Sequence, residues 1–334
     1  MPLTPRQVPT QQPSLAAKIR AHIAIARIDH WIKNVFVLPG IVVPLSVSHI
    51  PLDAGLAWRV FVGMLATCCV ASSNYVLNEI LDASYDRLHP IKKNRPAARG
   101  LVNVPIAYAQ WLLLFVIGMA LTARLSTPGL TWTLGALWLM GCIYNIPPVR
   151  SKDVPYLDVL SESVNNPIRM LAGWYMVTTN IFPPASLLVS YWMIGAYLMA
   201  LKRFSEFRQI NDRLRAGAYR RSFRMYTERS LLVSVTFYGS AAMLFFGAFI
   251  VRYRVELVLS FPLVALVMAV YYHLAFDENS PAQNPETLHR HRGLMVSCTL
   301  CVVAMATLLL VDLPILQKML APTMPQRGLM APTR

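Results

Sequence analysis

The sequence has little charge. Only 14% of its 334 residues are Asp, Glu, Lys or Arg, whereas 55% are hydrophobic and the mean hydropathy is +0.45. A soluble domain carries about 25% charged residues. Composition alone therefore excludes an ordinary soluble domain and predicts an all-α polytopic membrane protein.

Cysteine is also scarce, and no zinc or redox motif is complete. The five cysteines all fall in apolar runs, and Cys298-x-x-Cys301 has no second pair, so we interpret it as helix packing. A signal peptide is also unsupported, because no long apolar core with a small-residue cleavage site follows the first residues. Residues 14–31 mix basic and aliphatic side chains and are expected to form an interfacial helix.

Long apolar runs dominate the rest of the chain. A helix that crosses a bilayer needs about 20 residues. The runs are 33–50, 57–80, 103–123, 129–147, 156–179, 183–201, 230–251, 255–275 and 294–314. We therefore expect a bundle of about nine transmembrane helices in a single domain over residues 14–320. The ends, residues 1–13 and 321–334, are predicted to be disordered.

The few cations are unevenly distributed. With the N-terminus in the cytoplasm, segments on that side carry 23 of the 31 Lys and Arg residues, the opposite side carries 7, and Arg169 falls inside a span. This bias predicts an N-in, C-out orientation. All acids except Asp53, Glu256 and Asp312 fall on the cytoplasmic side too, which indicates a polar site there. The net charge of +15 indicates inner-leaflet contact and anionic substrates; nucleic acid is excluded, because no binding motif is present.

Residues 74–100 carry the strongest chemical signal. Four polar side chains recur every four residues: Asn74, Asn78, Asp82 and Asp86. In a helix they share one face, and Glu79 lies close enough to reach the same space. Mg²⁺ takes one or two carboxylates from a protein and completes its shell with water and substrate phosphates. We therefore predict a Mg²⁺ site at Asn78, Glu79, Asp82 and Asp86.

A basic stretch follows directly. Its charged side chains include Arg87, His89, Lys92, Lys93, Arg95 and Arg99. Carboxylates for a metal beside cations for phosphate are the two halves of a diphosphate site. The alternative is a solvated loop beside the membrane, but such a loop has no need of carboxylates on one helical face.

Three further stretches place polar residues on the same predicted side. Lys33 and Asn34 begin the first span, where Lys33 could also simply extend to the interface. In the stretch 144–173, Arg169 lies within a predicted span, where an arginine is costly and usually faces a polar cavity. The others in this stretch are Tyr144, Lys152, Asp158 and Glu162. The sixth run ends in Lys202, Arg203 and Glu206.

These residues resemble a known family. The pattern Asn78-Glu79-x-x-Asp82-x-x-x-Asp86 is similar to the first aspartate-rich signature of the UbiA superfamily of intramembrane prenyltransferases. That signature usually opens Asn-Asp, and here Glu79 stands second. The other stretches resemble the decaprenyl-phosphate phosphoribosyltransferase branch: His30-Trp31-Ile-Lys33-Asn34, Tyr144 with Lys152 and Asp158 leading to Arg169, and Lys202-Arg203-x-x-Glu206 with Arg220-Arg221 beyond.

The resemblance implies a reaction. It is Mg²⁺-dependent transfer of 5-phosphoribose from 5-phosphoribosyl 1-diphosphate to a polyprenyl phosphate, at the cytoplasmic face of a bacterial inner membrane. The product would be a precursor of arabinose donors for the cell envelope. The implied catalytic residues are Asp82, Asp86, Asp158 and Arg169, with Asp158 stabilising oxocarbenium character at the ribose. The implied substrate-binding residues are Lys33, Asn34, Arg87, Lys92, Lys93, Arg95, Tyr144, Lys152, Glu162, Lys202, Arg203 and Glu206.

Three alternatives stay open. The same Mg²⁺ site could ionise an isoprenyl diphosphate and prenylate an aromatic acceptor. An ion-coupled transporter would show inverted repeats and charges near the membrane midplane. A non-catalytic membrane scaffold predicts that Asp82→Ala leaves function intact. The sequence also leaves open the lipid chain length and whether the chain forms a homo-oligomer.

Overall fold

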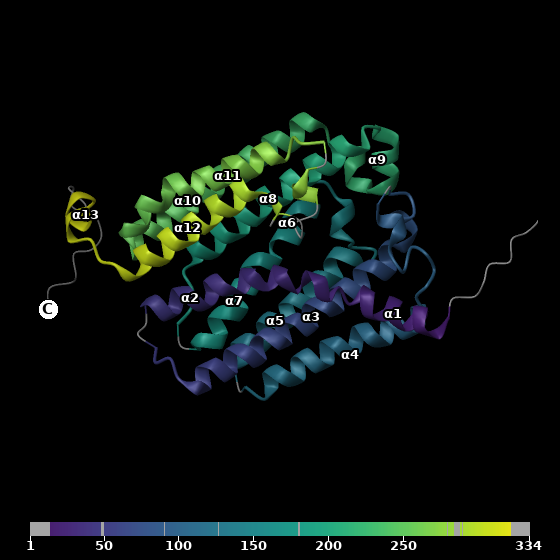
Figure 1. The fold of residues 1–334 in the computed structure, drawn as a ribbon, viewed down its shortest axis with the longest axis horizontal. Helices are drawn as coiled ribbons and strands as arrows, with labels where there is room; N and C mark the ends of the chain where they lie inside the picture. Colours follow the sequence, from purple (N-terminus) through teal and green to yellow (C-terminus); the bar gives the residue numbers. More distant parts are fainter. Residues whose placement is uncertain are drawn as a thin grey trace, which may run out of the picture.

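The computed structural model describes residues 14–47, 50–89, 91–125, 127–179, 181–278, 280–283, 288 and 290–321. All regular elements within these ranges are helical, and the long helices pack side by side in an elongated bundle (Figure 1). The all-helical architecture predicted from the sequence is therefore confirmed for the described residues. The predicted disordered ends, 1–13 and nearly all of 321–334, lie outside the described residues.

The helices differ widely in length. The long helices are α3 (Ala54–Asp86), α4 (Val104–Ala123), α5 (Pro128–Asn145), α8 (Ala185–Ile210), α10 (Glu228–Tyr253), α11 (Phe261–Leu274) and α12 (Arg292–Leu310). The shorter ones are α1 (Leu15–Ile25), α2 (Leu38–Val47), α6 (Leu157–Ser163), α7 (Asn165–Val177), α9 (Arg213–Tyr219) and α13 (Pro314–Met319). Short 3₁₀ segments are η1 (Ile28–Val37), η2 (Lys92–Asn94), η3 (Ser151–Asp153), η4 (Arg221–Arg224), η5 (Val255–Ser260) and η6 (Pro281–Gln283).

Seven stretches of the described chain are long and apolar enough to cross a membrane. They are Leu15–Ser46, Ala54–Asp86, Val104–Ala123, Ala185–Ile210, Glu228–Tyr253, Val255–Leu274 and Arg292–Leu310. The other two predicted runs correspond to α5 and to α6 with α7. α5 packs against α3 and α7, and α6 packs against α8; α6 ends at Ser163, and α7 begins at Asn165. The count of nine spans stays a prediction.

The longest helix, α3, organises one side of the bundle. It has 33 residues and is about 50 Å long at 1.5 Å per residue. Asp53 begins it, because its Oδ1 accepts a hydrogen bond of 2.6 Å from the backbone N–H of Leu56. No proline or glycine interrupts its second half, so the helix continues without a break to Asp86. It contacts α4, α5 and α7.

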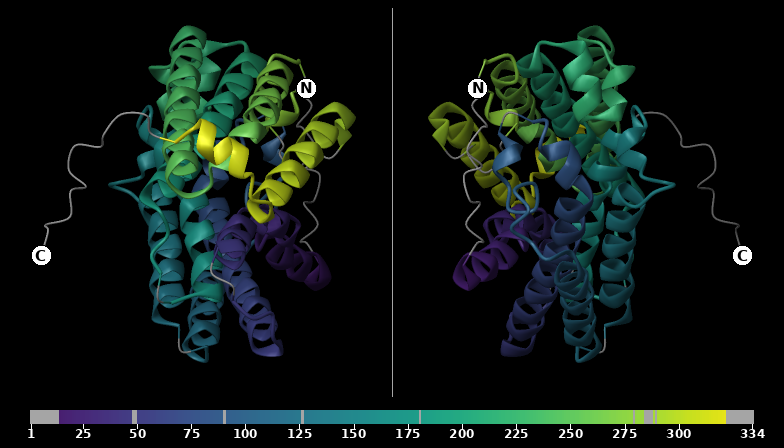
Figure 2. Two further views of the ribbon diagram at one scale, coloured as in Figure 1. Left: turned by 90° about the vertical axis from the view of Figure 1, so that its left-hand side faces the viewer. Right: turned by 90° about the vertical axis from the view of Figure 1, so that its right-hand side faces the viewer.

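Two apolar clusters lie on either side of the polar residues of the bundle. One is built mainly from α2, α3, α5 and α7, and the other from α8, α10 and the segments packed on them. Figure 2 shows these two groups of helices from both ends. Gly141 lets α5 approach α3 closely, since a Cβ there would lie 2.2 Å from the Asn74 side chain. Asn74 in turn donates to the Leu137 carbonyl at 2.8 Å.

Candidate active site

One polar cavity of about 320 Å³ lies between the two groups of helices. Its lining is rich in charged side chains, with ten cations and six carboxylates. The cations are Arg27, Lys33, Lys92, Arg95, Arg150, Lys152, Arg169, Lys202, Arg203 and Arg220. The carboxylates are Glu79, Asp82, Asp86, Asp153, Glu162 and Glu206. The cavity therefore has an excess of positive charge.

The polar face of α3 forms one wall, as its four-residue spacing predicts. All of Asn74, Asn78, Asp82 and Asp86 line the cavity, together with Glu79. Asp82 Oδ1 accepts hydrogen bonds from Lys152 at 2.5 Å and Arg150 at 2.9 Å. Glu79 is buried, and its Oε1 lies 3.4 Å from the Ala97 N–H, so it also contacts the loop after α3.

The donor set on α3 suits a magnesium ion that shares its coordination with substrate. Within the described residues, no group of three or more His, Cys, Asp and Glu side chains is arranged to hold a metal by itself. Asn78 Oδ1, Asp82 Oδ2 and Asp86 Oδ1 have no hydrogen-bond partner there, because these side chains bond through their other polar atoms. Mg²⁺ needs only one or two protein carboxylates when phosphate and water complete the shell. The residues present therefore fit Mg²⁺.

The loop after α3 contributes two of its predicted cations to the cavity. Arg95 donates to Asp86 Oδ2 at 2.8 Å, and Lys92 donates to Glu206 Oε1 at 3.2 Å and contacts the Tyr219 hydroxyl. The other two predicted cations do not line the cavity. Arg87 is exposed and donates to the Ala98 carbonyl at 3.0 Å, and Lys93 is exposed.

His89 organises this loop. It is buried, and its Nδ1 accepts the backbone N–H groups of Ile91 and Lys92 at 3.1 and 3.2 Å. Burial, with the adjacent Lys92 ammonium, lowers the pKa of His89 to about 4. The imidazole is therefore neutral at pH 7 and serves as an acceptor.

The segment after α5 supplies a cation pair that faces α3. Asn145, at the end of α5, accepts from Asn78 at 2.7 Å and from Lys152 at 2.7 Å. Burial, with Arg150 beside it, lowers the pKa of Lys152 to about 8, although Asp82 opposes the shift. The sequence predicted Lys152 but missed Arg150 and Asn145. Arg150 counted only as loop charge, because its partner Asp82 lies 68 residues earlier.

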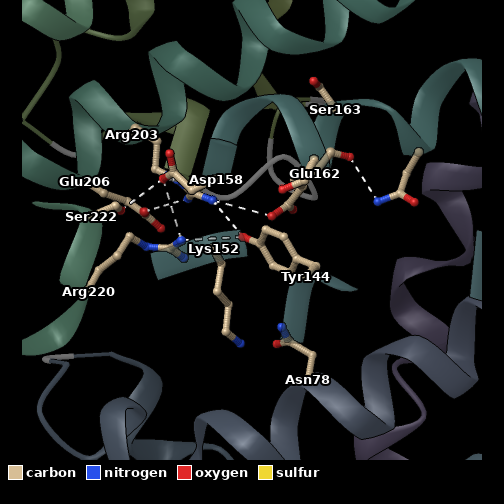
Figure 3. Close-up of polar contacts among 12 residues, drawn as sticks. Asn78, Tyr144, Lys152, Asp158, Glu162, Ser163, Arg203, Glu206, Arg220 and Ser222 are labelled. Atoms are coloured by element: carbon tan, nitrogen blue, oxygen red, sulfur yellow. Dashed lines mark hydrogen bonds and ion pairs between the residues drawn. The ribbon is translucent and has the colours of Figure 1, made fainter. Parts of the chain in front are cut away.

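On the opposite wall, Arg203 is the centre of a buried ion network (Figure 3). Its guanidinium donates to four groups: Glu206 at 3.0 Å, Asp158 at 3.2 Å, Tyr144 at 3.2 Å and Glu162 at 3.4 Å. The side chain is only 2% exposed. The structure thus brings together the predicted residues of two stretches, and Arg203 forms ion pairs with all three carboxylates among them.

Asp158 is the one predicted catalytic residue that does not line the cavity among the described residues. It is 0% exposed and does not line the cavity, so it cannot face a ribose there as the sequence led us to expect. Its carboxylate accepts from Tyr226 at 2.7 Å, Ser222 at 3.1 Å and Arg203 at 3.2 Å. The reason is the segment after α9, which covers the start of α6 and binds this carboxylate.

The deeper cations line the cavity as predicted. Arg169 does so, and its Nε donates to Asn34 Oδ1 at 3.2 Å. Asn34 itself is buried behind the wall and supports Arg169 instead of lining the cavity. Lys33 and Lys202 both line it, and Lys33 Nζ lies 3.0 Å from His30 Nδ1.

Sequence reasoning missed several lining residues, which lie in the predicted interfacial helix, beside Lys152 or in the basic stretch that follows Glu206. These are Arg27, His30, Asp153, Tyr219 and Arg220. Only His30 and Arg220 had any signal, since both stand in stretches that resemble the phosphoribosyltransferase branch.

Comparisons with known proteins identify the family of this chain. The model of the UbiA prenyltransferase family matches residues 36–295. The nodulation protein NoeC of Azorhizobium caulinodans is 28% identical over 242 residues, which cover 70% of this chain and 74% of that protein. The decaprenyl-phosphate phosphoribosyltransferase of Mycolicibacterium smegmatis is 32% identical over 238 residues, 67% of this chain and 68% of that protein.

Solved structures show the same fold. A UbiA homolog from Archaeoglobus fulgidus bound to DMAPP and Mg²⁺ matches with a TM-score of 0.65 at 16% identity, covering 87% of this chain and 100% of that one. The same homolog bound to Cd²⁺ gives a TM-score of 0.61. The family match covers most of the chain, and the apolar helices agree with it. This chain is therefore an integral membrane protein that belongs to the UbiA prenyltransferase family and resembles its decaprenyl-phosphate phosphoribosyltransferase branch.

Proposed function

We propose that the chain transfers 5-phosphoribose from 5-phosphoribosyl 1-diphosphate to a polyprenyl phosphate and releases diphosphate. The observation that carries this proposal is the cavity lining, where ten cations outnumber six carboxylates. The similarity to decaprenyl-phosphate phosphoribosyltransferases supports the same choice.

The charge balance favours this pair of substrates over prenylation of an aromatic ring. The donor carries a diphosphate and a 5-phosphate, and the acceptor carries a third phosphate group. All three are anionic at neutral pH, since the second pKa of a phosphate monoester is near 6. A prenyl diphosphate with an aromatic acceptor brings one diphosphate only. Cations on both walls of the cavity are expected for the first reaction and exceed the need of the second.

The α3 wall is the proposed diphosphate end. Asn78, Asp82 and Asp86 would hold Mg²⁺, which supplies charge neutralisation for the diphosphate when bound. Arg95, Arg150 and Lys152 surround these carboxylates and would bind the diphosphate oxygens. Their preformed positions lower the cost of placing negative charge there as the C1–O bond breaks.

The acceptor needs little activation. A phosphate oxygen is already an anion near pH 7 and can attack C1 of the ribose without a general base. This agrees with the neutral, structural His89. The cavity is also lined by apolar side chains, including Leu198, Met199, Tyr271 and Leu288. They offer a surface for the polyprenyl chain next to its phosphate.

The membrane arrangement belongs to the same proposal. We infer a single domain over residues 14–320 with about nine spans, the N-terminus inside and the C-terminus outside. The charge bias of the loops supports this orientation, which places the cavity at the cytoplasmic face of a bacterial inner membrane.

One paired assay tests the proposal. Purified protein with Mg²⁺ is given radiolabelled 5-phosphoribosyl 1-diphosphate and polyprenyl phosphate, and in parallel a labelled isoprenyl diphosphate with 4-hydroxybenzoate. We expect label to enter the product lipid only in the first reaction, and only with divalent metal. Transfer in the second reaction alone would replace phosphoribosyl transfer by prenyl transfer.

Metal-site variants sharpen this assay. Asp82→Asn and Asp86→Asn should each lower kcat by about 100-fold or more, the usual scale for loss of one group that stabilises developing charge. Lys93→Ala, which changes an exposed cation outside the cavity, is the control. Near-normal turnover in both Asn variants would contradict the metal assignment.

A further inference from the structure

We propose that Arg220 binds the 5-phosphate of the donor and that Asp158 is a positioning residue that holds Arg220 in place. The inference rests on the proposed function. Arg220 follows α9, lines the cavity and is not among the site residues predicted from the sequence.

Arg220 keeps hydrogen-bonding capacity that its neighbour Arg203 has used. Its Nε is buried and has no hydrogen-bond partner in the described structure. Its Nη1 makes one long hydrogen bond, 3.4 Å to the Tyr144 hydroxyl, and lies 3.9 Å from Asp158 Oδ2. Arg203, by contrast, donates to four protein groups. A guanidinium with unused donors in a polar cavity is suited to a bidentate phosphate.

Asp158 cannot be the ligand of a substrate, but it can orient this arginine. It is 0% exposed, and three donors already occupy it: Arg203, Ser222 and Tyr226. It attracts Arg220 without taking a full hydrogen bond from it, because the distance is 3.9 Å. The carboxylate therefore fixes the direction of the guanidinium and leaves its donors available.

The segment around Arg220 is fastened to α6 at two more points. Ser222 and Tyr226 both donate to Asp158, and the Tyr226 hydroxyl also accepts the backbone N–H of Tyr156 at 2.5 Å. The Arg220 guanidinium lies 5.9 Å from the Phe223 ring centre and 6.0 Å from that of Tyr219. These contacts set the position of Arg220 more firmly than a free loop would.

The position of Arg220 indicates which phosphate group of the donor it binds. Figure 3 shows Arg220 beside Tyr144 and Arg203, whereas Lys152 extends toward Asn78 on α3. The metal donors and the cations paired with them are on the α3 wall, which is the proposed diphosphate end. Arg220 lies with the opposite wall, so it meets the other anionic end of the donor.

Two inhibitors separate the two ends of the donor. Ribose 5-phosphate reports on the 5-phosphate position, and inorganic diphosphate with Mg²⁺ reports on the α3 wall. For Arg220→Gln we expect KM for the donor and the inhibition constant of ribose 5-phosphate to rise about 10- to 100-fold, the scale of lost hydrogen bonds to a charged group. The inhibition constant of diphosphate should change less than about threefold on the same scale. Arg215→Gln, an exposed neighbour whose side chain makes no hydrogen bond or ion pair in the described structure, is the matched control.

Asp158→Asn and Tyr226→Phe test the positioning role. Like Arg220→Gln, both variants should raise KM for the donor and the inhibition constant of ribose 5-phosphate. The change in kcat should be smaller. Tyr226→Phe preserves the fold if Asp158→Asn does not, because it removes only one hydroxyl. Added methylguanidinium should restore activity to Arg220→Ala and should not change the activity of Asp158→Asn. A variant that had lost activity only through a structural defect would not be rescued in this way.

The failures are distinct. If wild-type protein turns over the donor but Arg220→Gln keeps its KM and its affinity for ribose 5-phosphate, the inference is overturned alone. If Arg220→Gln weakens diphosphate instead, Arg220 serves the α3 end, and the assignment to the 5-phosphate is wrong. If the wild type neither turns over the donor nor binds ribose 5-phosphate, the proposed function fails, and the inference with it.

Discussion

Lys92 donates a hydrogen bond of 3.2 Å from its Nζ to Glu206 Oε1, and this contact joins the loop after α3 to the end of α8. The two residues are 114 positions apart in the sequence. Glu206 is 4% exposed and also pairs with Arg203, so the loop and the buried ion network share one carboxylate. Both residues line the cavity.

This contact predicts strong coupling between the two residues. Lys92→Met and Glu206→Gln should each lower the thermal midpoint in detergent, because each removes one member of a partly buried ion pair. The double variant should lose less than the sum, with a coupling energy of about 0.5–3 kcal/mol. The exposed pair Arg208 and Glu228, 4.0 Å apart, is the control and should couple weakly. Additive losses of stability at Lys92 and Glu206 would contradict coupling between the two residues.

Lys202 should act on substrate binding. It lines the cavity and has no ion pair or hydrogen bond in the part of the chain that the structure describes, so its charge is available to an anion. Lys202→Ala should raise KM for the donor about 10- to 100-fold, the scale of a hydrogen bond to a charged group. Lys93→Ala should leave KM unchanged. Steady-state kinetics test this role of Lys202. A lower kcat at constant KM would contradict a role in substrate binding.

His89 should make stability depend on pH in a defined window. Its pKa is lowered from 6.5 to about 4 in the folded protein, by burial first and then by Lys92. The unfolded chain therefore binds more protons between these two values, so His89 lowers stability as pH falls from about 6.5 to about 4. His89→Asn keeps an acceptor that does not titrate. Thermal midpoints at pH 7.5 and pH 5 should differ less in this variant; an equal difference would refute the effect.

Two glycines of α5 offer a matched test of the contact with α3. Gly141→Ala places a methyl group 2.2 Å from the Asn74 side chain and should displace it, with losses in thermal midpoint and in turnover. Gly135 on the same helix has no neighbouring atom within 4 Å of such a methyl group. Gly135→Ala should be neutral or stabilise the protein by up to about 1 kcal/mol, the helical preference of Ala over Gly. Similar behaviour of both variants would show that close packing at Gly141 is unimportant.

The sequence predicts the α3 wall well because its information is local. A four-residue repeat in an unbroken helix puts Asn74, Asn78, Asp82 and Asp86 on one face regardless of the rest of the fold. The all-helical class follows from composition for a similar reason. Arg169 was also predicted correctly, because an arginine within an apolar run is costly unless it faces a polar cavity.

Asp158 and Arg150 show where this reasoning stops. The surroundings of Asp158 come from Ser222 and Tyr226, more than 60 positions later in the chain. Arg150 has a positive φ of 27°, which sequence patterns do not indicate for an arginine, and it reaches back to Asp82. Both depend on how distant segments pack, and periodicity carries no information about that.

The length of α3 has one more consequence. At about 50 Å it exceeds the roughly 30 Å hydrocarbon layer of a bilayer by several turns. One continuous helix thus carries both the apolar residues of the bundle core and the carboxylates of the α3 wall, so the distance between them along the membrane normal is fixed. In the proposed reaction, a water-soluble sugar donor and a lipid headgroup would meet at this fixed depth while each stays in its own phase.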